Sequence, residues 1–210
     1  MQFRLTYEGI LKSSQSSNPA NHKHDIRKHF HPQLKHLWNT HTLLSSLRLG
    51  VEYDQISNKA FQGAFGFGLG EGRGKTLKEV ISEHRDFSRN GYTFVPLLCK
   101  RFCLHCSLDI LFLRIGPLAA IQNGDIDNRI KTLVDAIRMP RHGELKSGRK
   151  MPANGETPFF CLLEDDSFIT SLAVENDTLL SPDKVDRNYA KVVINVNIRP
   201  LYATAFNLGF

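Results

Sequence analysis

Two groups of carboxylates are the residues of this chain best suited to chemistry. The first lies in Gly-Asp-Ile-Asp-Asn-Arg-Ile-Lys and contributes Asp125 and Asp127, followed by Lys131 and Asp135; the second is the pair Asp165-Asp166. On an extended segment Asp125 and Asp127 would point to the same face, and on a helix Asp127, Lys131 and Asp135 would lie along one face. A strand that passes into a helix here would place three carboxylates and an ammonium in one small volume. That much charge requires a bound cation or solvent.

The chemistry that suits such a group is metal-dependent cleavage of a phosphodiester. Hard cations such as Mg²⁺ or Mn²⁺ prefer carboxylate oxygens, polarise a phosphoryl group and activate water. Lys131 would offset charge on the phosphate or on the leaving oxygen. A plainer interpretation of the first group is a turn that caps a helix, with Asp127 as the cap and Lys131 in a surface pair. The second acidic pair favours the metal site.

The two blocks together resemble the RusA-type Holliday-junction resolvases, which carry Asp-x-Asp-Asn-x-x-Lys and a later Asp-Asp pair. The likeness spans about residues 92–200, and the segment 1–11 corresponds to the first strand of that family, whereas 48–90 and 138–152 have no counterpart. The resemblance implies a RusA-like fold with insertions and a homodimer that cuts branched DNA such as four-way junctions. It also implies Asp125, Asp127 and Asp166 as ligands of Mg²⁺, with Mn²⁺ as an alternative, and Lys131 as a catalytic residue.

Asp165 and Asp135 are expected to support that site from its surroundings. Spacing alone does not choose between Asp165 and Asp166, because neighbours on a strand face opposite ways. The choice of Asp166 rests on the resemblance.

The charge of the chain favours a polyanionic partner. The formal net charge is +6, and cations gather beside the first acidic block. The ordinary interpretation of a basic stretch is a solvated loop; next to a site for phosphodiesters we expect contacts to DNA phosphates. The residues predicted to contact DNA are Arg129, Arg138, Arg141, Lys146, Arg149, Lys150, Arg27 and Lys28.

Three other patterns are compatible with function but have plainer explanations. The histidine-rich and basic segment 22–36 suits a helix start that contacts DNA, a zinc site with His22 and His24, or a solvated helix face. Cysteines at 99, 103 and 106 have the spacing of an iron–sulfur site but lie in an apolar, strand-like stretch, where buried thiols are expected. The glycine-rich run 63–74 ends in Gly-Lys-Thr, but Leu69 stands where a phosphate-binding loop needs its first glycine.

Hydrophobic periodicity predicts the elements that must position these residues. Strands are expected at 1–11, 92–115, 159–163, 170–179 and 189–198, with a short one at 51–56, and helices at 25–47 with a kink near Pro32, at 76–84 and at 127–138. The sum is a single α+β domain over 1–210, a mixed sheet with packed helices, whose core at 92–200 follows a basic and glycine-rich elaboration at 13–91. We expect no signal peptide or membrane span and a cytoplasmic location with reduced cysteines.

Overall fold

The computed structural model describes residues 1–14, 19–46, 48–49, 67–68, 75–83, 87–115, 125–145, 151–180, 186–203 and 207. Its centre is a four-stranded sheet in the order β1-β10-β7-β9, where β1 is Gln2–Ile10, β10 Tyr189–Pro200, β7 Leu104–Arg114 and β9 Ile169–Thr178. β10 runs antiparallel to β1 and β7, whereas β9 is parallel to β7, so the sheet is mixed. The predicted α+β class with a mixed sheet is confirmed.

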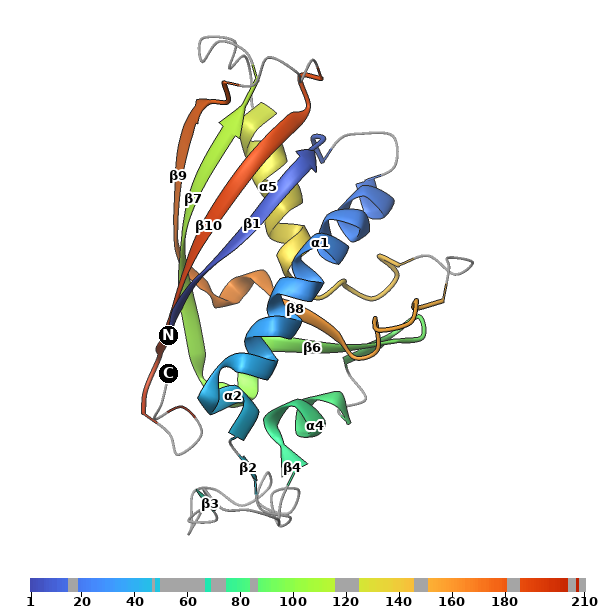
Figure 1. Ribbon diagram of the computed structural model, residues 1–210, viewed down its shortest axis with the longest axis vertical. Helices are drawn as coiled ribbons and strands as arrows, with labels where there is room; N and C mark the ends of the chain where they lie inside the picture. The colour runs from blue at the N-terminus through green and yellow to red at the C-terminus, as the bar shows by residue number, and fades with distance from the viewer. Residues whose placement is uncertain are drawn as a thin grey trace.

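Alternating side chains give the sheet one buried face. On β10 every second residue from Ala190 to Ile198 is buried, and on β7 the same holds from Leu104 to Phe112. Two helices cover this face, α1 at Pro19–Thr40 and α5 at Asp125–Ile137 (Figure 1). The helices bury apolar stripes at helical spacing, which are Ile26, Phe30, Leu34 and Trp38 on α1 and Ile130, Leu133 and Ile137 on α5.

A second sheet lies on the helix side, in the order β5-β6-β8, with β5 at Ser88–Arg89, β6 at Tyr92–Leu98 and β8 at Phe159–Leu163. β8 runs parallel to β6 and packs against α1, and all five of its residues are buried. A fully buried strand has apolar side chains on both faces, which explains the unbroken run Phe-Phe-Cys-Leu-Leu. This strand positions the second acidic pair, because only Glu164 and Asp165 separate it from the 3-10 helix η4 at Asp166–Phe168.

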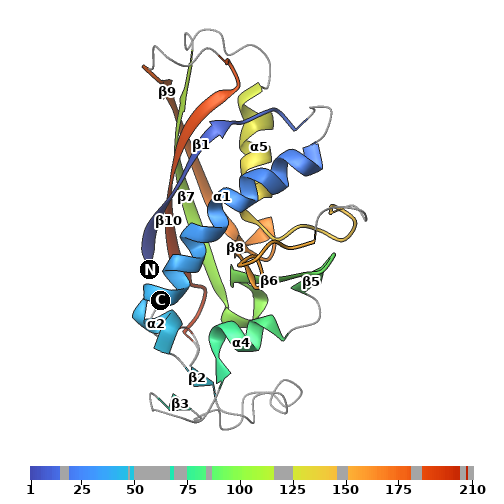
Figure 2. The ribbon, with the colours of Figure 1, turned by 45° about the vertical axis from the view of Figure 1, so that its right-hand side comes forward.

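The remaining elements are short. α2 is Thr42–Ser46, η2 is Lys100–Phe102, and β2 at Arg48–Leu49 pairs with both β3 at Phe67–Gly68 and β4 at Lys75–Thr76. α4 at Leu77–Ser82 begins with a capping box between Thr76 and Glu79. Figures 1 and 2 show β2, β3 and α4 at one end of the molecule, beyond α2.

Most predicted elements are confirmed, with differences in their bounds. The helix predicted at 25–47 is divided into α1 and α2, and η2 divides the stretch predicted at 92–115 into β6 and β7. α1 begins at Pro19 and runs through Pro32, where the sequence predicts a kink or a fresh start. α5 begins at Asp125, two residues before the predicted start. The strand predicted at 51–56 and most of the glycine-rich run 63–74 lie outside the described residues.

Candidate metal centre and nucleic-acid interface

The first acidic block opens α5 at one end of the main sheet. Arg129 fixes this end, because its buried guanidinium donates to the carbonyl of Leu11 at 3.2 Å and to Oδ1 of Asn188 at 3.2 Å. Leu11 follows β1 and Asn188 precedes β10, so the first turn of α5 lies where those strands end and begin. Arg129 therefore positions α5, and its guanidinium is in the interior rather than on a surface that DNA could contact.

Asp125 and Asp127 both belong to the first turn of α5. The extended segment that would have put them on one face is therefore not formed, and residues two apart on a helix do not face each other. The four-residue spacing from Asp127 to Lys131 is retained, and both of these residues are exposed. The carboxylate of Asp127 and the ammonium group of Lys131 are therefore accessible to solvent on neighbouring turns of α5.

Asp135 continues the same helix but lies in a buried ion cluster. Its carboxylate accepts from Nζ of Lys23 on α1, and from Nε and Nη2 of Arg138 at 3.0 and 2.7 Å. Burial opposes its ionisation, but the hydrogen bond from Lys23 and the charge of Arg138 outweigh burial and lower the pKa of Asp135. The carboxylate of Asp135 thus links α5 to α1. Its oxygens accept from Lys23 and Arg138, so this geometry does not match the predicted supporting role at a metal site.

Arg27 and Arg138, both predicted to contact DNA, are buried in this cluster. Arg27 donates to the carbonyls of Arg138 and Asp135 at 3.0 and 2.7 Å and pairs with Glu144 at 3.0 Å. Arg138 pairs with the other oxygen of Glu144 at 3.2 Å. The structure therefore places both guanidinium groups inside the protein. The helical spacing could have indicated that Arg27 is buried, because it lies three residues before Phe30 and seven before Leu34, on the buried stripe of α1.

The second acidic pair is half-buried at the junction of β8 and η4. Asp165 caps η4, since its Oδ1 accepts from the backbone N–H of Ser167 at 3.1 Å, and this hydrogen bond is the main reason that the pKa of Asp165 is lowered. Nη2 of Arg141 lies 3.3 Å from Oδ1 of Asp166 and 3.8 Å from Oδ2 of Asp165. The side chain of Arg141 is 63% exposed, so this guanidinium is open to a phosphate as well.

The two acidic blocks lie at opposite ends of the main sheet. Ile169, which directly follows η4, pairs with Cys106 at the start of β7, whereas Thr178 pairs with Arg114 at its end. The end of α5, in turn, adjoins β8, because the N–H of Met139 donates to the carbonyl of Leu163 at 2.7 Å. From Asp127 to Ile137 the helix rises about 15 Å. In Figures 1 and 2, η4 lies near the lower end of α5, away from the first turn.

The first block and the second pair therefore do not converge within one chain. Among the residues that the structure describes, no three His, Cys, Asp or Glu side chains are close enough together to hold a metal ion. The side chain of Asp125 lies outside that description. The sequence could not show that the two acidic blocks lie apart. Residue spacing determines which face of a helix a residue occupies, but it does not determine which end of that helix a distant strand reaches.

Of the other predicted DNA contacts, Arg141 and Lys28 are accessible. Lys28 is 37% exposed and pairs with Glu156 at 3.0 Å. Lys146, Arg149 and Lys150 lie outside the described residues.

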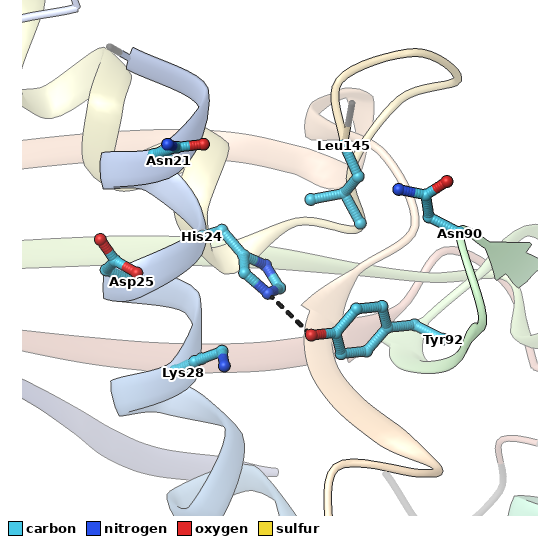
Figure 3. A pocket seen from close by; sticks show the side chains of 7 residues that line it. All are labelled: Asn21, His24, Asp25, Lys28, Asn90, Tyr92 and Leu145. Carbon is cyan, nitrogen blue, oxygen red and sulfur yellow. Dashed lines mark hydrogen bonds between the residues drawn. The ribbon is translucent and has the colours of Figure 1, made fainter. Parts of the chain in front are cut away.

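A pocket of about 300 Å³ lies beside the first half of α1. Figure 3 shows Asn21, Asp25 and Lys28 along the helix, with His24 directed at the hydroxyl of Tyr92, 3.3 Å away. Leu145 and Asn90 close the other side. No pattern in the sequence indicates this pocket, because its walls come from three segments that are far apart in the chain.

Two histidines of the segment 22–36 hold backbone groups in place. His22 accepts from the backbone N–H of Lys12 at 2.9 Å, and His31 accepts from that of Phe160 at 2.9 Å.

Of the three cysteines with iron–sulfur spacing, Cys99 and Cys106 are buried free thiols as expected, and burial raises the pKa of Cys106 to about 12. A thiol of that pKa is protonated and is a poor metal ligand at neutral pH. Cys103 is only partly buried, and its Sγ lies 2.9 Å from the hydroxyl of Tyr202.

No protein-family model, no curated protein and no solved structure matches this chain. In the described part of the molecule, none of the helices has the length and apolar character that crossing a bilayer requires.

Proposed function

We propose that this chain is a magnesium-dependent endonuclease that cuts branched DNA, with a RusA-like fold and a homodimeric, cytoplasmic form. The observation that carries the proposal is that each acidic block has an aspartate open to solvent with a cation beside it. Asp127 has Lys131 one turn away on α5, and Asp166 has Arg141 at 3.3 Å. Carboxylates next to exposed cations suit a reaction in which a polyanion must approach a metal-binding centre.

Asp125, Asp127 and Asp166 are the ligands proposed for Mg²⁺ or Mn²⁺, which would polarise the phosphodiester and activate water when bound. Lys131 would neutralise charge on the scissile phosphate. Arg141 and Lys28, together with Lys146, Arg149 and Lys150, would contact phosphates without reading sequence.

The variant Asp127→Asn tests the proposal. It removes a metal ligand without changing side-chain size, so we expect loss of Mg²⁺-dependent cleavage of four-way junctions with junction binding retained or tightened. Asp109→Asn is the matched control, because Asp109 is exposed on β7, on the face of the sheet away from the helices. Full cleavage by Asp127→Asn would refute the assignment.

A non-catalytic module that binds branched DNA is the second candidate. It is favoured by one observation, the separation of the two acidic blocks within a chain. The two candidates are distinguished by gel assays that compare junction, fork, flap and linear duplex with and without Mg²⁺ or Mn²⁺. Binding of branched DNA without a cut in any arm would support the module. A third possibility, a metal-dependent nucleotide phosphohydrolase, would instead appear in a screen of small substrates.

A further inference from the structure

The pocket beside α1 has a polar rim and a buried floor. Three exposed residues form the rim, namely Asn21, Asp25 and Asn90. Three residues that are between 4% and 6% exposed form the floor, namely His24, Tyr92 and Leu145. A ligand therefore passes hydrogen-bonding groups before it reaches a largely apolar, aromatic surface, which is the usual build of a small-molecule site.

The aromatic floor is held in place by packing and by hydrogen bonds. The rings of His24 and Tyr92 meet edge to face with their centroids 5.3 Å apart, and His24 is stacked on Phe159 with centroids 5.8 Å apart. The hydroxyl of Tyr92 lies 3.3 Å from Nε2 of His24 and donates to Oε2 of Glu156 at 3.4 Å. Because the floor is pre-organised in this way, binding a flat ligand orders few side chains.

Asn90 is positioned at the rim by the turn that joins β5 to β6. Arg89 pairs with Tyr92 across this hairpin. The loop between them is Asn90-Gly91, and both residues have positive φ, of 53° and 83°. This conformation is typical of a tight two-residue hairpin turn, which fixes the direction in which the side chain of Asn90 leaves the backbone. Figure 3 shows the carboxamides of Asn21 and Asn90 on opposite sides of the pocket, where each offers a donor and an acceptor.

The charges around the pocket favour an uncharged ligand. Lys28 contributes a cation to the lining, and it pairs with Glu156 at 3.0 Å. Asp25 adds a second carboxylate at the rim. These two carboxylates offset Lys28, so the interior of the pocket does not attract a phosphate. A nucleobase is uncharged and flat, stacks on aromatic rings, and carries on its edges the donors and acceptors that carboxamides recognise.

The pocket also adjoins the segment that contacts the second acidic pair. Leu145 lies four residues after Arg141, in a turn closed by a hydrogen bond of 3.0 Å from the N–H of Glu144 to the carbonyl of Arg141. Four residues span at most about 14 Å. The guanidinium of Arg141 lies 3.3 Å from Asp166. A DNA strand whose phosphate is held by Arg141 therefore has bases within a few nucleotides of the pocket.

We propose that this pocket binds a nucleobase, with its ring on the aromatic floor and its polar edges at the carboxamides of Asn21 and Asn90. The base can belong to a free nucleoside or to an unpaired nucleotide of a DNA strand, since both present the same chemistry. An unpaired base costs least to take out of a stack. The inference goes beyond the proposed function, because it requires neither a metal ion nor cleavage.

Titrations of the full chain with the four deoxynucleosides, followed by saturation-transfer NMR, test the pocket directly. We expect saturable binding of at least one nucleoside and none of deoxyribose, which lacks a base. The variant Asn21→Ala/Asn90→Gly should weaken binding at least about fivefold for each carboxamide, the lower limit for a bidentate amide contact with a base. Glycine tolerates the positive φ and alanine suits a helix, so the fold should persist. Gln2→Ala removes an exposed carboxamide on β1, outside the pocket, and should bind as wild type does.

A second arm uses DNA and distinguishes the two sources of the base. Fluorescence anisotropy in Ca²⁺ compares a duplex with a one-base bulge, the same duplex with an abasic bulge, and the fully paired duplex. If the pocket takes its base from a strand, the bulged base should bind at least about fivefold more tightly than the abasic bulge, as stacking on an aromatic side chain provides. The double variant should lose this preference and keep its affinity for the paired duplex.

Binding in the nucleoside arm alone identifies a free nucleoside as the ligand, and preference in the DNA arm alone identifies a nucleotide of a strand. The pocket assignment is overturned if neither arm shows a base-dependent signal, or if the double variant keeps that signal at wild-type thermal stability. Asn21→Ala alone, at an exposed helical position, decides the matter if the change in the turn destabilises the protein. A protein that binds a base but never cuts DNA would refute the proposed function and leave the pocket assignment intact.

Discussion

Asp165 and Asp166 are adjacent in sequence, but their carboxylates have different partners. The two side chains are exposed to a similar extent, but Oδ1 of Asp165 accepts from the N–H of Ser167, whereas Oδ1 of Asp166 lies 3.3 Å from Arg141. An asparagine at 165 can still accept the capping bond. We therefore expect Asp165→Asn to keep most of the cleavage activity and Asp166→Asn to abolish it. Parallel single-turnover assays check this, and equal losses in the two variants would contradict the distinction.

Arg27 and Lys28 are adjacent cations of one helix with opposite environments. Arg27 is 1% exposed and paired with Glu144, so Arg27→Ala would leave a buried carboxylate without one of its two cations and is expected to cost about 3–5 kcal/mol of unfolding free energy. Lys28→Ala removes a partly exposed pair with Glu156 and should cost less than about 1 kcal/mol. Urea denaturation measures both. A loss for Arg27→Ala as small as that for Lys28→Ala would show that the buried pair does not stabilise the fold.

At the scale of elements, the sequence predicted which segments form strands and helices better than it predicted where they meet. Alternation in 189–198 and helical spacing in 127–138 are local signals, and β10 and α5 follow them. The continuity of α1 through Pro32 is decided by packing, because Phe30, Leu34 and Trp38 bury one stripe on both sides of the proline. The positions of Asp127 and Asp166 at opposite ends of the sheet depend on the β7–β9 register, which no local pattern encodes.

The contact between α1 and α5 is expected to weaken in acid. Burial opposes the ionisation of Asp135 and Glu144. Lys23 and Arg138 nevertheless lower the pKa of Asp135, and Arg27, the backbone N–H of Arg141 and Arg138 lower the pKa of Glu144, below the values of an unfolded chain. The stabilisation is therefore complete above the unfolded pKa values of about 3.9 and 4.3. It is lost as pH falls through the lower folded values.

Urea denaturation from pH 7 to pH 3 checks this dependence. The wild-type unfolding free energy should fall below about pH 4, and Asp135→Asn should show a shallower fall from a lower starting value. Asp109→Asn, on the exposed face of β7, should have the wild-type slope. An unchanged slope in Asp135→Asn would mean that other carboxylates cause the acid sensitivity.

At the scale of the whole molecule, the net charge of +6 is not fully available to a partner. Arg27, Arg129 and Arg138 are buried and are neutralised or bonded within the protein, so the surface that meets DNA depends on fewer cations than the sequence indicates. Arg141 is an exposed cation that the structure places beside the second acidic pair, 3.3 Å from Asp166.

This arrangement predicts how DNA binding responds to salt. Each phosphate that a cation neutralises contributes about 0.9 to the slope of log K against log salt concentration. Arg141→Gln should therefore reduce the slope by about one and weaken binding to all sequences alike, whereas Arg27→Gln should leave the slope unchanged in protein that remains folded. Lys191→Gln is a surface control, because Lys191 is 48% exposed on the face of the sheet away from the helices. Fluorescence anisotropy with a four-way junction in Ca²⁺ between about 50 and 200 mM salt spans the range in which such contacts change affinity most. If the slope for Arg141→Gln equals that of wild type, Arg141 does not contact DNA phosphates, and its charge only pairs with the carboxylates of Asp165 and Asp166.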